Sequence, residues 1–364
     1  MADSFDKFEV PIIPNRPLKF VGESESFGTV ALRRNKENGL IENAAFDQQQ
    51  IQYDADYQNN QALSGSFEAH MRSVIEIVKS RYPAGARIVE VGCGKGDFLE
   101  FLQAEDRFDV RGYDGAYEGN NPSIEKRFLT SADKLDADLV VLRHVLEHIQ
   151  RPHEFLSLLA GIFDGADIYI EVPDFSWIED NQAFFDITYE HVNYFTPDSL
   201  ASLFDSTDQQ GLLFGDQYQF AIGRLDEAAH LDFGRAYDAE ANWAALSFAE
   251  VFPDFERMID EIDAASADSA VYVWGAATKG VMFCHHLKRL RPAIFERIRA
   301  AVDINPMKAG RFMPSVQLPI LDVDSLCSQA SGAELVIIMN PNYQHEIVAD
   351  LEARGFPGIR NICV

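Results

Sequence analysis

Ionisable and aromatic side chains gather in one short stretch of the chain, residues 184–200, with the sequence FFDITYEHVNYFTPDSL. Tyr189, Glu190 and His191 are consecutive in it. A histidine suits proton transfer because its pKa lies near neutrality. A surface loop without a ligand seldom needs such a density of these groups, so we expect Tyr189 to His191 to contact one. Four aromatic residues of the stretch are predicted to anchor it in the core: Phe184, Phe185, Tyr194 and Phe195.

A further candidate, His144, lies in the segment RHVLEHI, directly after the apolar run ADLVVL. Ligands of open α/β sheets bind at the carboxyl ends of the strands. His144 is therefore predicted to face a ligand at such an edge. Glu147 and His148 are expected on a helix that follows, where His148 is interpreted as a packing or capping residue.

The elements that must position these groups begin with the stretch ARIVEVGCGKGDFLE, residues 86–100. Its β-branched run predicts a buried parallel strand, and the apolar residues at its end have helical spacing. Between them, Gly92, Gly94 and Gly96 let the backbone pass close to a ligand. The free N–H groups at the start of the helix then face that ligand.

The glycine spacing is G-x-G-x-G, with Glu90 two residues before the first glycine. It differs from the dinucleotide fingerprint G-x-G-x-x-G. It resembles motif I of the class I methyltransferases, which use S-adenosylmethionine (SAM). Asp114 ends a second apolar strand and is suitably placed to hold both ribose hydroxyls. We therefore expect SAM to bind at this turn.

The order of predicted strands and helices indicates an α/β protein with a mainly parallel sheet. Residues 1–62 are expected to form a small irregular cap, in which VPII and LKFVG are short strands. Residues 63–245 are predicted to be a Rossmann-like class I methyltransferase core that ends in a hairpin over LLFGDQYQFAIGRL. Residues 246–364 repeat the pattern as a second Rossmann-like domain, and its first helix is expected over FAEVFPDFERMIDEI.

Composition narrows the classes of partner. The formal net charge of −27 disfavours nucleic acid and anionic membrane, because both need a basic surface. The four cysteines lie far apart, with neither a C-x-x-C zinc motif nor a disulfide framework. There is no apolar run of about 20 residues and no signal-like N-terminus. We therefore expect a cytoplasmic protein with a small-molecule substrate.

Over most of its length the chain resembles the SAM-dependent C-methyltransferases that act on nucleotide-linked deoxysugars. The motifs that carry the resemblance are FDQQQIQYDADYQNNQALSGSF, EVGCGKGDFL, RHVLEHI, YEHVNYF, VWGAATKG and VDINPMKAG. The resemblance implies an N-terminal zinc domain, a SAM domain and a C-terminal Rossmann-like domain. The sequence departs from it twice. No cysteine precedes Cys93, so we expect no metal, and Tyr189-Glu190-His191 is contiguous where the family has Tyr-x-Glu-His.

The resemblance also implies roles for individual residues. In a nucleotide-linked keto-deoxysugar, His191 would remove the proton next to the ketone, and Glu190 would orient that base. Tyr189 and His144 would hydrogen-bond the developing enolate oxygen. The residues implied for SAM contact its amino-acid portion, its ribose and its adenine; they are Glu90, Gly92, Gly94, Gly96, Asp114 and Asp133.

Three other functions remain open. A SAM-dependent O- or N-methyltransferase acting on another small metabolite would use His191 to deprotonate a hydroxyl or an amine. An NAD(P)-linked oxidoreductase would use the turn VWGAATKG, which lacks a third glycine and carries Lys279. A non-catalytic module would bind SAM or a nucleotide without turnover, and the joint presence of Asp114, His144 and His191 disfavours it.

Overall fold

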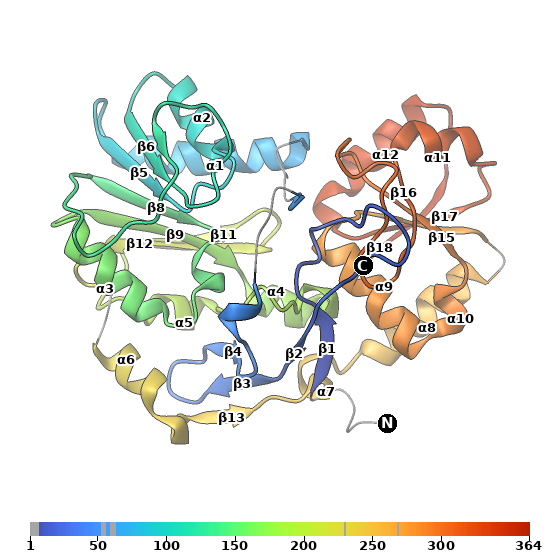
Figure 1. Ribbon diagram of the computed structural model, residues 1–364, viewed down its shortest axis with the longest axis horizontal. Helices are drawn as coiled ribbons and strands as arrows, with labels where there is room; N and C mark the ends of the chain where they lie inside the picture. Colours follow the sequence, from blue (N-terminus) through green and yellow to red (C-terminus); the bar gives the residue numbers. More distant parts are fainter. Residues whose placement is uncertain (1–6, 52–55, 59–62, 229–230, 268) are drawn as a thin grey trace.

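The computed structural model describes residues 7–51, 56–58, 63–228, 231–267 and 269–364. Two α/β domains lie side by side, and the N-terminal strands lie below both of them in the view of Figure 1. None of the described helices is both long and apolar enough to cross a lipid bilayer.

A seven-stranded sheet with the order β11-β12-β9-β8-β5-β6-β7 forms the core of the first domain. Its strands are β5 (Arg87–Val91), β6 (Asp109–Tyr113), β7 (Ile124–Glu125), β8 (Leu139–Arg143), β9 (Asp167–Pro173), β11 (Gln209–Leu213) and β12 (Tyr218–Arg224). The strands β5 to β9 pair in parallel, whereas β11 and β12 form an antiparallel hairpin that joins β9. The predicted parallel sheet and terminal hairpin are therefore confirmed.

The helices of this domain are α1 (Gly65–Arg81), α2 (Asp97–Ala104), α3 (Pro152–Ile162), α4 (Phe175–Asp180), α5 (Pro197–Ala201) and α6 (Leu231–Asp238). The helix expected directly after β8 is wrong, because Leu146–His148 form only a short 3-10 turn, η3. The reason lies at His144, whose φ of +54° turns the backbone into the left-handed region and away from a helical path.

The second domain is built on a five-stranded parallel sheet with the order β16-β15-β14-β17-β18. Its strands are β14 (Val271–Trp274), β15 (Ile298–Val302), β16 (Ile320–Leu321), β17 (Leu335–Ile338) and β18 (Arg360–Cys363). Its helices are α7 (Phe248–Val251), α8 (Phe255–Ser266), α9 (Thr278–Leu290), α10 (Pro292–Phe295), α11 (Val323–Gln329) and α12 (Gln344–Ala353). The single helix expected over residues 248–262 is two, because Pro253 has no N–H to continue α7.

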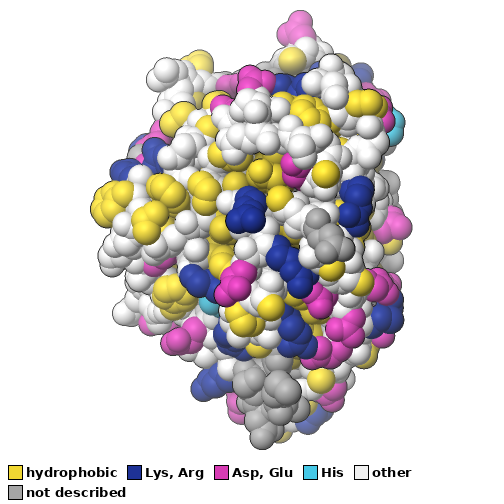
Figure 2. Space-filling model, turned by 90° about the vertical axis from the view of Figure 1, so that its right-hand side faces the viewer, with side chains coloured by type: hydrophobic (Ala, Val, Ile, Leu, Met, Phe, Trp, Pro, Cys, Tyr) yellow, Lys and Arg dark blue, Asp and Glu magenta, His cyan; other side chains and the backbone are white. Residues whose placement is uncertain are grey.

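Figure 2 looks onto this second domain and shows acidic and basic side chains interspersed with hydrophobic ones over its surface.

The N-terminal residues form two small sheets. The strands β1 (Phe8–Pro11) and β2 (Phe27–Val30) pair with each other. The strands β3 (Leu32–Asn35) and β4 (Ile41–Asn43) join β10 (Asn193–Tyr194) and β13 (Trp243–Ala245) in the order β10-β4-β3-β13. The strand expected over LKFVG is wrong, because only a single bridge forms there, between Leu18 and Phe312. The cap is thus hydrogen-bonded to the segment that follows His191.

One hydrophobic cluster joins the cap, the segment before His191 and the C-terminal domain. It contains Val10 and Val30 of the cap strands together with Phe184 and Phe283. The ring centroid of Phe184 lies 5.1 Å from that of Phe255 and 6.0 Å from that of Phe283. All four predicted aromatic anchors of this stretch are buried, which confirms that interpretation.

Gly280 provides a test of how tightly α9 packs on the turn after β14. A Cβ at Gly280 would lie 1.8 Å from the backbone oxygen of Gly275. We expect Gly280→Ala to destabilise the protein by about 1–3 kcal/mol, measured as a lower melting temperature. Gly161→Ala is the matched control, because a Cβ there meets open space inside a helix. Its stability should stay the same or rise by about 0.5–1 kcal/mol; equal melting temperatures for the two variants would contradict the packing argument.

Candidate active site

A cavity of about 550 Å³ lies between the two domains. The first domain lines it with residues that follow β8 and with three members of the stretch 184–200; they are His144, Glu147, His148, Asp186, Glu190 and His191. The C-terminal domain lines it with the turn after β14 and the start of α9. Segments at the carboxyl ends of β8 and β14 therefore meet at one space, as is usual for ligand sites of α/β sheets.

His144 enters the cavity from the end of β8, between two carboxylates. Its Nε2 atom lies 3.1 Å from Glu171 Oε1, and its Nδ1 atom lies 3.6 Å from Glu147 Oε1. The first contact is an ion-pair distance without the alignment of a hydrogen bond. Burial alone would lower the pKa of His144, but the two carboxylates outweigh burial and raise it to about 9. His144 is therefore an imidazolium at neutral pH.

His191 has the opposite character. Its Nδ1 atom is buried and has no hydrogen-bond partner among the described residues. Its ring centroid lies 4.9 Å from that of His148. Burial, together with the neighbouring His148, lowers the pKa of His191 to about 3. The near-neutral pKa expected of a histidine is therefore wrong for both residues: the cavity brings together a charged imidazole, His144, and a neutral imidazole, His191, that is a weak base.

Two neighbours of His191, Glu190 and His148, also line the cavity. Glu190 lines the cavity, and its carbonyl oxygen accepts a hydrogen bond of 2.8 Å from His148 Nδ1. His148, interpreted from the sequence as a packing or capping residue, lines the cavity as well.

Tyr189 is buried elsewhere. Its hydroxyl oxygen accepts a hydrogen bond of 2.9 Å from the backbone N–H of Asp47. Its ring packs on Gly28, where a Cβ would lie 2.3 Å from a ring carbon. The structure therefore brings His144, Glu190 and His191 together at the cavity and holds Tyr189 against the cap, so we give Tyr189 no part in the chemistry.

The predicted SAM turn follows β5. Gly92, Gly94 and Gly96 have φ angles of 76°, 55° and 87°, which side chains rarely tolerate. A Cβ on Gly92 would meet Val145 at 2.6 Å, whereas one on Gly94 would meet open space. Asp114 stabilises the turn, because its Oδ2 atom accepts a hydrogen bond of 2.9 Å from the N–H of Gly94. The backbone at Gly94 is therefore the part of the turn that is open to a ligand.

Two other carboxylates of the predicted SAM set differ in their surroundings. Glu90 is buried, and its Oε2 atom has no hydrogen-bond partner among the described residues. Burial raises the pKa of Glu90 to about 7. An orphan carboxylate beside the glycine turn fits a polar part of SAM. Asp133, in contrast, accepts a hydrogen bond of 2.7 Å from the N–H of Thr130 and pairs with Arg127 at 3.0 Å, so its carboxylate is already engaged.

Among the described residues, two clusters have the spacing of metal ligands; they are Glu147, His148 and His191, and His70, His144 and Glu171. Existing cations already neutralise their carboxylates. The imidazolium of His144 lies next to Glu147, and the guanidinium of Arg143 lies 3.0 Å from Glu171. These charges oppose a further cation, and we assign no metal to either cluster.

Sequence reasoning missed the two carboxylates that flank His144. Glu147 was expected on a helix, and Glu171 was not considered. Glu171 is a charged residue inside the apolar strand β9, sequence DIYIEVP. A buried carboxylate is costly unless it is paired, so an acid within the apolar interior of such a strand is the signal that could have found it.

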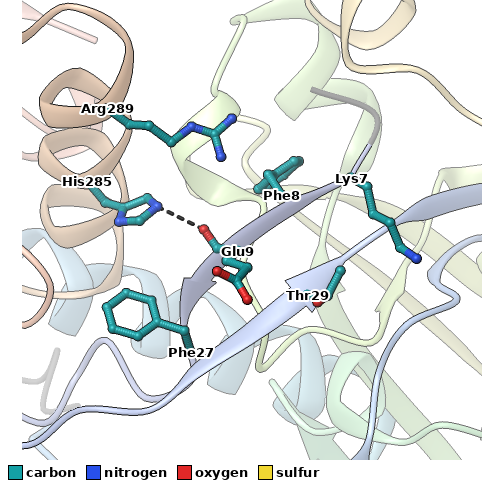
Figure 3. Close-up of a pocket in the computed structure, with 7 residues that line it drawn as sticks. All are labelled: Lys7, Phe8, Glu9, Phe27, Thr29, His285 and Arg289. Carbon is teal, nitrogen blue, oxygen red and sulfur yellow. Dashed lines mark hydrogen bonds between the residues drawn. The ribbon is translucent and has the colours of Figure 1, made fainter. Parts of the chain in front are cut away.

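A second hollow of about 580 Å³ lies between the β1–β2 hairpin and α9 (Figure 3). The residues that line it are Lys7, Phe8, Glu9, Phe27, Thr29, His285 and Arg289. His285 uses both ring nitrogens there, with Nε2 2.9 Å from the carbonyl oxygen of Glu9 and Nδ1 2.6 Å from Ser315 Oγ. This histidine holds the hairpin to the helix, and none of the predicted site residues lines the hollow.

The sheet order, the left-handed glycine turn after β5 and the acid after β6 together define a class I SAM-dependent methyltransferase. Comparison with known proteins gives the same class. A family model described as a methyltransferase domain matches residues 66–210, and one described as a C-methyltransferase C-terminal domain matches residues 247–362. C-methyltransferase NovU of Streptomyces niveus is 24% identical over 324 residues, which are 78% of this chain and 74% of NovU. The chain is a SAM-dependent methyltransferase with SAM as its cofactor, and its two matched domains support a C-methyltransferase.

Solved structures with a similar fold cover part of the chain. A SAM-dependent methyltransferase of Archaeoglobus fulgidus is 18% identical with a TM-score of 0.36, covering 45% of this chain and 96% of that chain. The 1,6-didemethyltoxoflavin-N1-methyltransferase of Burkholderia thailandensis, which holds S-adenosylhomocysteine, is 13% identical with a TM-score of 0.33. It covers 43% of this chain and 78% of its own.

SAM binding is expected to depend on Asp114. Asp114→Ala removes the predicted acceptor for the ribose and the hydrogen bond that holds Gly94. We expect the dissociation constant for SAM to rise by about 10- to 100-fold, which corresponds to roughly 1.5–3 kcal/mol, in a calorimetric titration. Asp136→Ala is the control, because that carboxylate is 87% exposed. An affinity that is the same in both variants would remove Asp114 from the SAM site.

Proposed function

We propose that this C-methyltransferase transfers the SAM methyl group to a carbon next to a ketone in a nucleotide-linked deoxysugar, with His191 as the base. The observation that carries the proposal is the arrangement of two imidazoles at one cavity. His191 offers an unpartnered Nδ1 atom, and His144 offers a proton held between Glu147 and Glu171.

A carbon next to a ketone becomes nucleophilic only after it loses a proton. In the proposed reaction the imidazole of His191 accepts that proton, and negative charge develops on the ketone oxygen. The imidazolium of His144 donates a charge-assisted hydrogen bond to this enolate oxygen. Bound SAM supplies an electrophilic methyl group, so a carbon–carbon bond forms as the sulfur–methyl bond breaks. The proton on His191 then returns to solvent.

The far wall of the cavity supports a nucleotide-linked substrate. The turn after β14 and the N-terminus of α9 line this wall, and helix N-termini favour anionic groups such as phosphates. The volume of about 550 Å³ lies within the range of small-molecule pockets. The match to a C-methyltransferase C-terminal domain favours carbon over oxygen or nitrogen as the acceptor.

Replacement of the base should slow the chemical step and leave cofactor binding intact. We expect His191→Asn to lower kcat by about 10²- to 10⁴-fold. The dissociation constant for SAM should change little, because the predicted SAM contacts lie on the glycine turn. His153→Asn is the matched control, since that imidazole packs on Phe233 and Tyr237 and does not line the cavity. A higher KM with an unchanged kcat would make His191 a binding residue.

Proton abstraction can also be observed without methyl transfer. The enzyme is incubated in D₂O with S-adenosylhomocysteine and a nucleotide-linked 4-ketosugar, and the C–H groups next to the ketone are followed by NMR. Wild type and His153→Asn should exchange one of these protons, and His191→Asn should not. Equal exchange in all three would exclude His191 as the base. With SAM in place, an O–CH₃ or N–CH₃ signal in the product would contradict C-methylation.

A further inference from the structure

Glu171 is contacted by four side chains, one of which, His144, lines the cavity. It is fully buried on β9. Its Oε2 atom accepts a hydrogen bond of 2.7 Å from the hydroxyl of Tyr169. Its Oε1 atom lies 2.9 Å from His70 Nε2, 3.0 Å from Arg143 Nη2 and 3.1 Å from His144 Nε2. Only the last of these groups reaches the cavity.

The charges of this cluster balance only when Glu171 is ionised. Burial alone would raise the pKa of Glu171, but Arg143, His144 and His70 hold it well below its ordinary value. Burial lowers the pKa of His70 and raises that of Tyr169, so both of these side chains are neutral. The cations are Arg143 and His144, and the anions are Glu171 and Glu147.

The other groups that face His144 are uncharged, so they do not stabilise its positive charge as Glu147 and Glu171 do. The ring of Tyr218 lies 4.5 Å from that of His144 between centroids, and the pKa of its hydroxyl is raised by burial, so it is uncharged. His191 is neutral, because burial lowers its pKa. The charge of His144 therefore depends on Glu147 and Glu171.

Arg143 connects the same carboxylate to the SAM half of the site. Its guanidinium lies over the ring of Phe98, 4.5 Å from the centroid. Phe98 is in the first turn of α2, the helix that follows the glycine turn. Glu171 thus contacts two residues with different surroundings. His144 reaches the cavity, and Arg143 packs on Phe98 of α2, the helix that follows the glycine turn.

We propose that Glu171 is a positioning residue for methyl transfer, which holds His144 at the cavity in its charged form. The inference rests on the proposed role of His144 as the donor to the enolate oxygen. Glu171 acts through His144 and does not itself touch the reacting atoms.

The sign of the effect follows from the charges. His144 carries a raised pKa of about 9, so its positive charge is present at neutral pH and is lost as the pH rises through that value. In Glu171→Gln, His144 keeps only the carboxylate of Glu147 as an ion-pair partner. His144 should then lose its proton at lower pH, by about one unit or more for the loss of one adjacent opposite charge. The alkaline decline of the pH–rate profile should move in the same direction.

The test combines NMR titration with kinetics on the full-length protein. Histidine-labelled wild type, Glu171→Gln and Tyr169→Phe are titrated, and His144 is assigned from the loss of its signal in His144→Gln. In Glu171→Gln, the titration of His144 and the alkaline limb of kcat should both shift to lower pH. At pH 8, kcat should fall by about 10-fold or more, with a KM for SAM within about twofold of wild type. Tyr169→Phe removes a neutral hydrogen bond from the same carboxylate, so it should leave both pH midpoints unchanged.

The other possible outcomes distinguish a failure of the inference about Glu171 from a failure of the proposed role of His144. A His144 titration that does not move in Glu171→Gln would overturn the inference and leave the proposed reaction intact. A shifted titration with an unchanged pH–rate profile would remove His144 from the proposed reaction, and the inference with it. If Glu171→Gln does not fold, the wild-type titration still decides, because a midpoint at or below about 6.5, the ordinary histidine value, would exclude a carboxylate that keeps His144 charged.

Discussion

A carboxylate buried in the centre of a sheet is stable only when cations and donors surround it, and the first domain satisfies this condition around Glu171. The strand register provides the first cation, because Arg143 of β8 is the direct partner of Glu171 on β9. His144 follows at once, and its left-handed backbone ends β8 beside the same carboxylate. His70 approaches from α1. The need to pair the buried carboxylate of Glu171 therefore fixes the position of His144, which lines the cavity.

The other imidazole of the cavity, His191, is positioned mainly by packing and strand pairing of the segment that carries it. The stretch before His191 is anchored at two points. Phe184 packs in the hydrophobic cluster, and Tyr189 packs against Gly28 of the cap. The backbone of β10, after His191, pairs with β4 of the cap. The ion pair of 2.5 Å between Asp186 and Lys279 ties the same stretch to α9. The cap therefore contributes to the site by supporting the segment that carries His191.

These two kinds of support explain which parts of the site the sequence could predict. The glycine turn, Asp114 and the cavity positions of His144 and His191 follow from local patterns, since each lies next to a strand end or in a dense polar stretch. The position of Tyr189 depends on Gly28, a residue far away in the chain with no visible motif. The role of His70 depends on a carboxylate 101 residues further along. The turn η3 could not be predicted either, because nothing in the local sequence reveals the left-handed backbone at His144.

The contrast between the two imidazoles comes from where the carboxylates lie. Glu147 and Glu171 both flank His144, so burial there leads to a charged side chain. Burial and the imidazole of His148 lower the pKa of His191, and the nearby carboxylate of Glu147 does not offset them, so burial there leads to a neutral side chain. Desolvation acts on both residues with the same sign, and only the distribution of partners separates them. A pair of titratable groups whose environments push their pKa values apart is the arrangement that assigns acid and base roles in enzymes. The sheet edge holds the proposed acid, His144, and the anchored loop holds the proposed base, His191, so the fold itself places the two groups on different sides of the cavity.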